Sequence, residues 1–297
     1  MIKKTMVIIF LLFGILNQVS YAHLDNKKFI EVQIHSLDEL IALFKKHHYT
    51  SKHWQKGNRE VPRLIFSGVS EKWKIASSHI PVKQKKQVFF RLMAPLVLMS
   101  NENILKEREV VKSASWSSKQ LLAIAKKYRL KTKSDSGLTN NERQQLLLQV
   151  DIMPPSLALA QAAEESGWAT SRFTEEGNAF FGQWDFSGKG MTPKQQRKEL
   201  GNYGLARFDS PLDSVEAYML NINTTAAYKK LRILRERLRQ ENKEITGLAL
   251  AGTLDKYSER GQAYIDGLRS MIRYNKLEDV DEAYLSDTIL IKLVTTK

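Results

Sequence analysis

The sequence of 297 residues contains no cysteine, and its six histidines all lie before residue 80. Disulfide bonds and thiol catalysis are therefore excluded in any redox compartment. Beyond residue 150, a Ser-His-Asp triad confined to that half and a zinc site built from the usual His and Cys ligands are also excluded. Carboxylates, hydroxyls and aromatic rings remain as the working chemistry there. The sequence indicates no metal site and no cofactor.

Long apolar runs are scarce, and the one at residues 6–16 follows Lys3 and Lys4 and precedes small residues at 20–22. A short positive stretch, an apolar core too short to span a bilayer comfortably and small residues at the end are typical of a secretory signal peptide. We therefore expect residues 1–22 to direct export, to the periplasm or cell envelope after cleavage. An uncleaved membrane anchor is the alternative. Lipid attachment is excluded because no cysteine follows the run.

Acidic residues are fewer than basic ones, which gives a formal net charge of +14, or +12 without Lys3 and Lys4. Such a charge concentrates a protein near anionic polymers or surfaces. For an exported protein these include peptidoglycan with its peptide carboxylates, anionic wall polymers and anionic lipid. Nucleic acid is disfavoured as a partner by the signal peptide and by the absence of a nucleic-acid-binding motif.

A small mixed segment is predicted at residues 23–83. Residues 29–34 and 64–66 are typical of short strands, and the capping-box pattern at 36–39 predicts a helix that runs toward Lys46.

A helical region that packs on the following domain is predicted at 84–145. Apolar residues recur at helical spacing over 84–111, where Pro95 predicts a kink or a break between two shorter helices. A second helix is expected at 117–128 and a third from about Asn141.

The remaining domain, 146–275, is predicted to be mainly helical with a small β-hairpin lobe, so the fold class is mainly α (α+β). Its first helix spans 156–166, and the hairpin is expected to use strands at 180–181 and 205–208. The tail at 276–297 carries no strong signal for any element. Later helices are predicted at 210–220, 226–240, 246–254 and 262–275.

Glu165 is the best-placed acid of this domain. It lies at the end of an apolar-lined helix, just before Gly167 and Trp168. A helix C-terminus and partial burial beside an indole both disfavour a negative charge, so they favour a carboxyl that stays protonated near neutral pH. Glu164 lies about 100° around the helix and is expected to face solvent. Spacing alone leaves open that Glu165 is an ordinary surface residue.

Several ordered motifs between about residues 84 and 275 resemble the glucosaminidase family that includes the flagellar peptidoglycan hydrolases and the Bax-type proteins. The pattern is a small-residue helix that ends in Glu-Ser-Gly-Trp, then a short loop and an Asn-x-Phe-Gly motif. The matching residues are 156–168, 178–182, 207–210, 213–215, Tyr218, 257–261 and Tyr264.

The resemblance implies a lysozyme-like helical fold with a small β-lobe across the cleft, and endo-β-N-acetylglucosaminidase activity on peptidoglycan glycan strands. Glu165 matches the catalytic acid of the family, Tyr257 matches an active-site tyrosine and Tyr264 its neighbour. The flagellar branch has a second carboxylate on the hairpin. Glu199 is the candidate for it here, and Asp185 is the alternative.

Substrate-binding roles are predicted for Tyr264 and four further residues, because aromatic rings pack on the C–H faces of sugars. Core packing is the alternative for each ring, and Tyr257 could instead be a buried ring whose hydroxyl meets a backbone partner. The four residues are Trp168, Asn178, Phe181 and Trp184.

The chain departs from the family pattern at three places. Ala169 stands where the family often has glycine, Phe180 lengthens the Phe-Gly motif, and Gln183 and Trp184 replace the more usual apolar-basic continuation. Such changes can reshape a sugar subsite, so two alternatives are kept. One is a lytic transglycosylase or muramidase on the same fold, and the other is a domain that binds the cell wall without cutting it.

Overall fold

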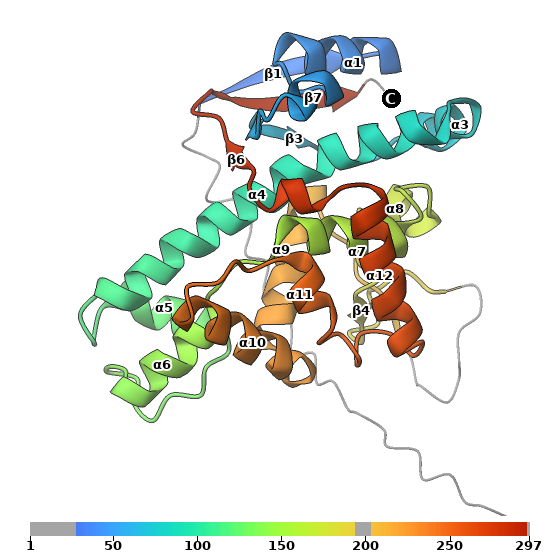
Figure 1. Ribbon diagram of the computed structural model, residues 1–297. Coiled ribbons are helices and arrows are strands. Elements are labelled where there is room, and N and C mark those ends of the chain that lie inside the picture. Colours follow the sequence, from blue (N-terminus) through green and yellow to red (C-terminus); the bar gives the residue numbers. More distant parts are fainter. Residues whose placement is uncertain (1–27, 194–202, 296–297) are drawn as a thin grey trace, which may run out of the picture.

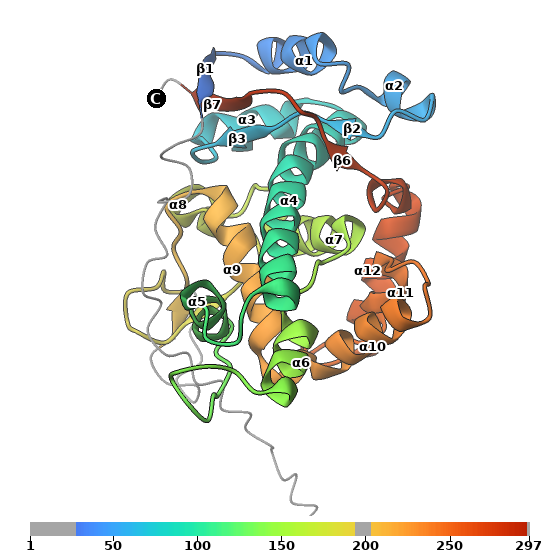
Figure 2. The ribbon, with the colours of Figure 1, turned by 90° about the vertical axis from the view of Figure 1, so that its left-hand side faces the viewer.

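The computed structural model describes residues 28–193 and 203–295, and the signal-peptide prediction for 1–22 lies outside them. The fold is mainly α with small β elements, as predicted. Figures 1 and 2 show a small sheet with its flanking helices on one side, the long helix α4 beneath it, and a body of helices on the other side of α4.

The first described segment forms the predicted strands β1 and β3 and the predicted helix α1, whose N-cap Ser36 accepts a hydrogen bond from the Glu39 amide at 3.2 Å. Helices α2 and α3 were not predicted. The elements are β1 (Phe29–Ile34), α1 (Leu37–Lys46), α2 (Ser51–Gln55), β2 (Glu60–Val61), β3 (Leu64–Phe66) and α3 (Glu71–His79).

The C-terminal tail completes this sheet. Strand β7 (Leu290–Thr295) lies between β1 and β3 and is parallel to both, and β6 (Tyr284–Leu285) pairs with β2. The tail, whose sequence carries no strong signal for any element, thus forms two strands. The tail is short, and its partner strands lie more than 200 residues away, so local sequence patterns carry little of the signal. Residues Leu290, Ile291 and Leu293 are buried in the completed sheet.

Helix α4 (Val82–Ser113) runs without a break through Pro95, so the predicted alternative of two shorter helices is wrong. A proline inside a helix costs about 3 kcal/mol. Fourteen residues of α4, Pro95 among them, are buried, and packing on this scale offsets that cost. By length and composition α4 could cross a membrane, but 67% of its most apolar stretch is buried, as in a core helix.

The predicted helices of the helical body are all present, with ends shifted by a few residues, and the short helix α8 was not predicted. Its helices are α5 (Lys119–Lys127), α6 (Asn140–Gln149), α7 (Pro155–Ser166), α8 (Arg172–Gly177), α9 (Pro211–Thr224), α10 (Lys229–Gln240), α11 (Gly247–Ala251) and α12 (Gln262–Tyr274).

The connection from α6 to α7 is fixed by a buried carboxylate. Asp151 is 1% exposed and accepts two hydrogen bonds from Arg239, at 2.6 and 2.5 Å, while Arg235 and Arg108 lie 3.6 Å from it. Burial alone raises the pKa of Asp151, but the hydrogen bonds from Arg239 and the nearby charges outweigh it and lower that pKa. The ionised cluster anchors the start of α7 to α4 and α10.

A second carboxylate caps two helices at once. Asp281 follows the 3₁₀ turn Glu278–Val280 and accepts hydrogen bonds from the Ser156 amide (2.8 Å), the Ser156 hydroxyl (2.7 Å) and the Gly247 amide (3.0 Å). It therefore satisfies backbone donors in the first turns of both α7 and α11. The C-terminal segment thus holds the helix that carries Glu165.

We expect Asp281→Ala to lower the free energy of unfolding by about 2–4 kcal/mol, because three hydrogen bonds to a charged acceptor are lost. Asp279→Ala is the matched control. Asp279 lies in the same turn, is partly exposed and pairs with Arg59 at 3.2 Å, so its loss should cost about 0–1 kcal/mol. Urea denaturation followed by circular dichroism measures both, and equal losses would contradict the capping role.

Candidate active site

Helix α7 is buried along almost its whole length. Ten of its twelve residues are buried, and only Glu164 and Glu165 at its end have part of their side chains accessible. The small alanine side chains let α4, α11 and α12 pack closely around it. The helix ends at Gly167, which adopts a left-handed conformation with φ of 57°. Glu165 is therefore held at the end of a rigid element.

A chain of hydrogen bonds leads from the core to the Glu165 carboxyl. The Tyr218 hydroxyl donates to Oε1 of Gln161 at 2.6 Å, and Nε2 of Gln161 donates to the Tyr264 hydroxyl at 3.1 Å. The Tyr264 hydroxyl in turn donates to Oε1 of Glu165 at 2.8 Å. Each tyrosine has only one proton to donate, so this order makes Oε1 an acceptor. A proton on the Glu165 carboxyl then belongs on Oε2.

The other carboxyl oxygen of Glu165 faces Gly182. A Cβ atom added to Gly182 would lie 3.3 Å from Oε2, and the φ of Gly182 is +60°. Both the close approach and the left-handed backbone favour glycine. The glycine of the Phe-Gly motif thus places no side chain of its own against Oε2.

The pKa of Glu165 is raised above its ordinary value. Burial is the largest cause, and the charge of Glu164 adds to it, while the hydrogen bond from Tyr264 and the charge of Arg260 partly offset it. Arg260 acts on Glu165 through its charge, while its guanidinium forms an ion pair with Glu164 at 2.6 Å. Because the folded pKa lies above the unfolded one, Glu165 favours the native state at low pH. That contribution is lost as the pH rises through the folded pKa.

Aromatic side chains form the wall around Glu165. The rings of Tyr257 and Tyr264 stack with centroids 5.5 Å apart, and those of Phe181 and Tyr218 stack at 4.0 Å. The Tyr257 hydroxyl donates to the Phe181 carbonyl at 3.2 Å, which is the backbone partner that the alternative interpretation of Tyr257 supposed. The structure thus brings together Glu165, Tyr264, Tyr257 and Phe181, with the Phe181 ring buried.

Two other predicted residues have their contacts elsewhere. The Trp168 ring lies edge-on to Phe89 and Phe90 of α4, and Lys86 lies 4.9 Å from its centre. The Asn178 amide donates to the Phe208 carbonyl at 3.1 Å and to the Ser67 carbonyl at 3.4 Å. The contacts of both side chains support the loops that frame the site.

The hairpin lobe is present, but its strands differ from the prediction. Strands β4 (Trp184–Asp185) and β5 (Gly204–Leu205) pair in antiparallel fashion, and residues 180–181 form no strand because both phenylalanine rings turn into the core. Trp184 is 38% exposed and stacks on Tyr203 at 4.8 Å, which gives the lobe an accessible aromatic surface.

The structure describes one of the two candidates for a second carboxylate, Asp185. Glu199 lies outside the described residues. Asp185 accepts hydrogen bonds from the Ser187 amide and hydroxyl, both at 2.9 Å, so its carboxylate is committed to a local turn. Within 28–193 and 203–295, no group of three or more His, Asp or Glu side chains could hold a metal ion.

The turn after Glu165 is strained. Trp168 and Ala169 have φ angles of 63° and 61°, a left-handed conformation that disfavours residues with a Cβ atom. A hydrogen bond from the Ala169 amide to the Ser166 hydroxyl, at 2.9 Å, helps to hold it. Glycine adopts this conformation without strain. Ala169, which stands where the family often has glycine, therefore keeps the same turn at a cost in free energy.

Sequence reasoning identified Glu165 and its tyrosines but missed the roles of Gln161 and Tyr218. Gln161 lies one turn before Glu165, on a helix whose neighbouring side chains are apolar. A lone amide on a buried face needs polar partners, and that is the signal that could have indicated the chain of hydrogen bonds.

Comparison with known proteins gives one family and one similar protein. Residues 141–277 match the glucosaminidase family, described as mannosyl-glycoprotein endo-beta-N-acetylglucosaminidase. The protein bax of Escherichia coli (strain K12) is 34% identical over 200 residues, which are 65% of this chain and 70% of that protein. No solved structure matches the chain.

We expect Tyr264→Phe to raise the pKa of Glu165 further, because the hydrogen bond that stabilises the ionised carboxylate is lost. Tyr257→Phe is the control, since its hydroxyl binds the Phe181 carbonyl and not the carboxylate, and it should change that pKa less. Carbon-13 NMR titration of the side-chain carboxyls, with the signal assigned through Glu165→Gln, measures the pKa. An unchanged or lower pKa in Tyr264→Phe would contradict the proposed hydrogen bond.

Proposed function

Because the chain belongs to the glucosaminidase family that includes protein bax, we propose that it is an exported endo-β-N-acetylglucosaminidase that hydrolyses peptidoglycan glycan strands. One observation carries the proposal. A carboxyl with a raised pKa lies at the end of a buried helix, and its Oε2 is turned toward a glycine. This is the arrangement that a general acid requires.

In the proposed reaction Glu165 gives the proton on Oε2 to the glycosidic oxygen as the bond to the anomeric carbon breaks. The leaving sugar departs as an alcohol, and a positive charge develops on the other sugar. The carboxylate that remains still accepts the hydrogen bond from Tyr264 on Oε1. A water molecule then adds to the anomeric carbon and returns a proton to Glu165.

The developing sugar cation needs a second stabilising group. The N-acetyl group of the substrate, the hydroxyl of Tyr257 and the carboxylate of Glu199 are the candidates. Tyr257 would have to release the Phe181 carbonyl to act. Among the described residues, Glu164 is the acid whose charge raises the pKa of Glu165, and it pairs with Arg260. The N-acetyl group and Glu199 stay as candidates for the stabilising group.

The substrate and the location follow from other features. The accessible ring of Trp184, which stacks on the buried Tyr203, offers a surface for the C–H faces of a sugar. The positive charge of the chain suits an anionic envelope, and residues 1–22 suit a secretory signal. Together they support peptidoglycan in the periplasm or cell envelope as the substrate, with no cofactor required.

We expect Glu165→Gln to lower the rate of peptidoglycan digestion by about 10²–10⁴-fold, because a general acid contributes on that scale. Glu164→Gln is a matched control on the neighbouring residue, which is partly exposed and paired with Arg260, and it should retain most of the activity. Mass spectrometry of borohydride-reduced products measures the new glycan ends. Comparable rates for Glu165→Gln and wild type would refute the role of Glu165.

The same experiment separates the alternative functions. Reduced N-acetylglucosamine ends support the proposed bond specificity. Anhydromuramic or reduced muramic ends would assign the chain to a lytic transglycosylase or muramidase that uses the same acid. No new ends from wild type would favour a domain that binds the wall without cutting it.

A further inference from the structure

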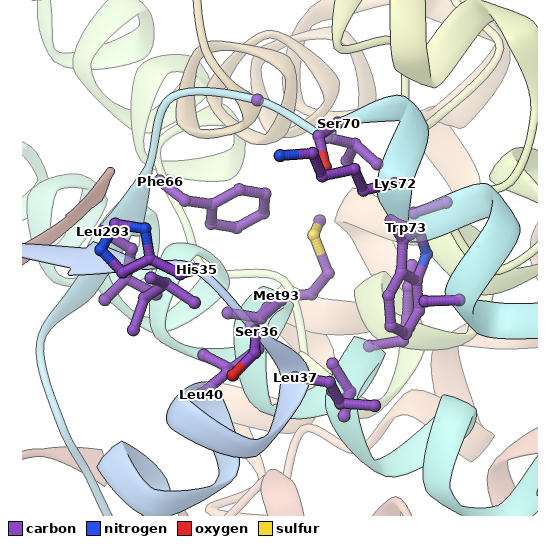
Figure 3. Close-up of a pocket in the computed structure, with 18 of the residues that line it drawn as sticks. His35, Ser36, Leu37, Leu40, Phe66, Ser70, Lys72, Trp73, Met93 and Leu293 are labelled. Carbon is purple, nitrogen blue, oxygen red and sulfur yellow. The ribbon is translucent and has the colours of Figure 1, made fainter. Parts of the chain in front are cut away.

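A cavity of about 170 Å³ lies between the sheet and the helical body. Figure 3 shows its side chains around an open space, with Phe66 and Leu293 on one side and Trp73 on the other. The cavity opens to solvent, since its lining includes the exposed residues His35, Ser36 and Lys72. Apolar cavities of about 150 Å³ are large enough to bind a molecule the size of benzene. The space is therefore large enough for a ligand.

The lining of the cavity is almost entirely apolar. Its walls come from the sheet, α1, α3 and α4, and include Leu40 and Met93. The polar lining side chains are His35, Ser36, Ser70 and Lys72. Water is poorly accommodated in such a space because it needs two to four polar partners. A hydrocarbon group gains free energy there by leaving water.

The polar side chains of the lining favour an anionic head group. Ser36 and Ser70 are the N-cap residues of α1 and α3, and Ser70 makes no side-chain hydrogen bond to the first turn of α3. The Trp73 amide of that turn donates to the Ser70 carbonyl at 2.9 Å, and the Ser70 hydroxyl accepts from none of the amides of the turn. Among the described residues that line the cavity, one side chain is a Lys, Arg, Asp or Glu, and it is the basic Lys72. The acids in the first turns of these helices, Asp38, Glu39 and Glu71, do not line the cavity.

We propose that this cavity binds the hydrocarbon tail of a single-chain anionic amphiphile such as a fatty carboxylate, with the head group at Lys72 and the first turn of α3. Ala169 and Phe180, which also line the cavity, belong to the turn after Glu165 and to the loop before Gly182. A bound tail therefore contacts both segments that frame the candidate active site. The binding site itself does not depend on the proposed hydrolase activity.

Binding is tested with octanoate and octan-1-ol, which share a tail and differ in the head group. The full-length chain is labelled with carbon-13 in its methionine methyl groups, and the Met93 signal is assigned through Met93→Leu. We expect saturable shifts of the Met93 signal with both ligands and tighter binding of octanoate. Octyl phosphate, titrated in parallel, shows whether the head-group site prefers a carboxylate or a phosphate.

Two sets of variants test the tail and head sites separately. Ala76→Phe places a ring in the cavity from α3 and should weaken both ligands by about tenfold or more. Lys72→Gln should weaken octanoate by about fivefold and leave octan-1-ol within about twofold. Lys74→Gln, on the same helix but outside the lining, should leave both unchanged. Thermal unfolding confirms that each variant is folded.

The proposal is overturned if wild type shows no saturable shift of Met93, or if folded Ala76→Phe binds octanoate as tightly as wild type. Equal effects of Lys72→Gln and Lys74→Gln on octanoate would overturn the assignment of the head group. Loss of octanoate binding in Ala76→Phe with unchanged hydrolysis of peptidoglycan would support a site that is separate from the active site.

Discussion

The burial of α7 on all sides is the constraint on which the position of Glu165 depends. Its alanines allow α4, α11 and α12 to approach closely, and Gly247 comes so near that a Cβ atom there would lie 2.1 Å from the Ser156 hydroxyl. A helix packed this tightly has little freedom to shift, so the carboxyl at its end is presented in one place. The same burial raises the pKa of Glu165. Position and protonation therefore have one cause.

Helix α4 joins the two parts of the molecule into one structure. Phe89 and Met93 belong to the large core of the helical body, whereas Val88 and Leu98 belong to the small core under the sheet. Asp281 makes a second connection, because it comes from the segment that leads into β6 and β7 and binds the first turn of α7. The sheet is thus part of the framework that holds the candidate active site.

Local patterns in the sequence were enough for most of the helical body. The Pro-Pro start of α7, the N-cap residues and the apolar spacing are encoded within a few residues of each element, and so was the placement of Glu165 at a helix end. Three features depended on distant contacts and could not be found in this way. Strand β7 needs partners more than 200 residues away. Pro95 is tolerated inside α4 because that helix is packed into the core. The role of Gln161 depends on tyrosines from α9 and α12.

The parallel sheet also has a consequence for the order of events during synthesis. Among the described strands, β1 and β3 do not pair with each other, and both pair with β7, which is made more than 200 residues later. A chain that still lacks β7 therefore carries two strands with unpaired edges. The smaller core cannot close before β7 is made, because Ile291 and Leu293 are part of it. A chain that is truncated before β7 would keep this apolar surface exposed, which is the kind of surface that chaperones and proteases recognise.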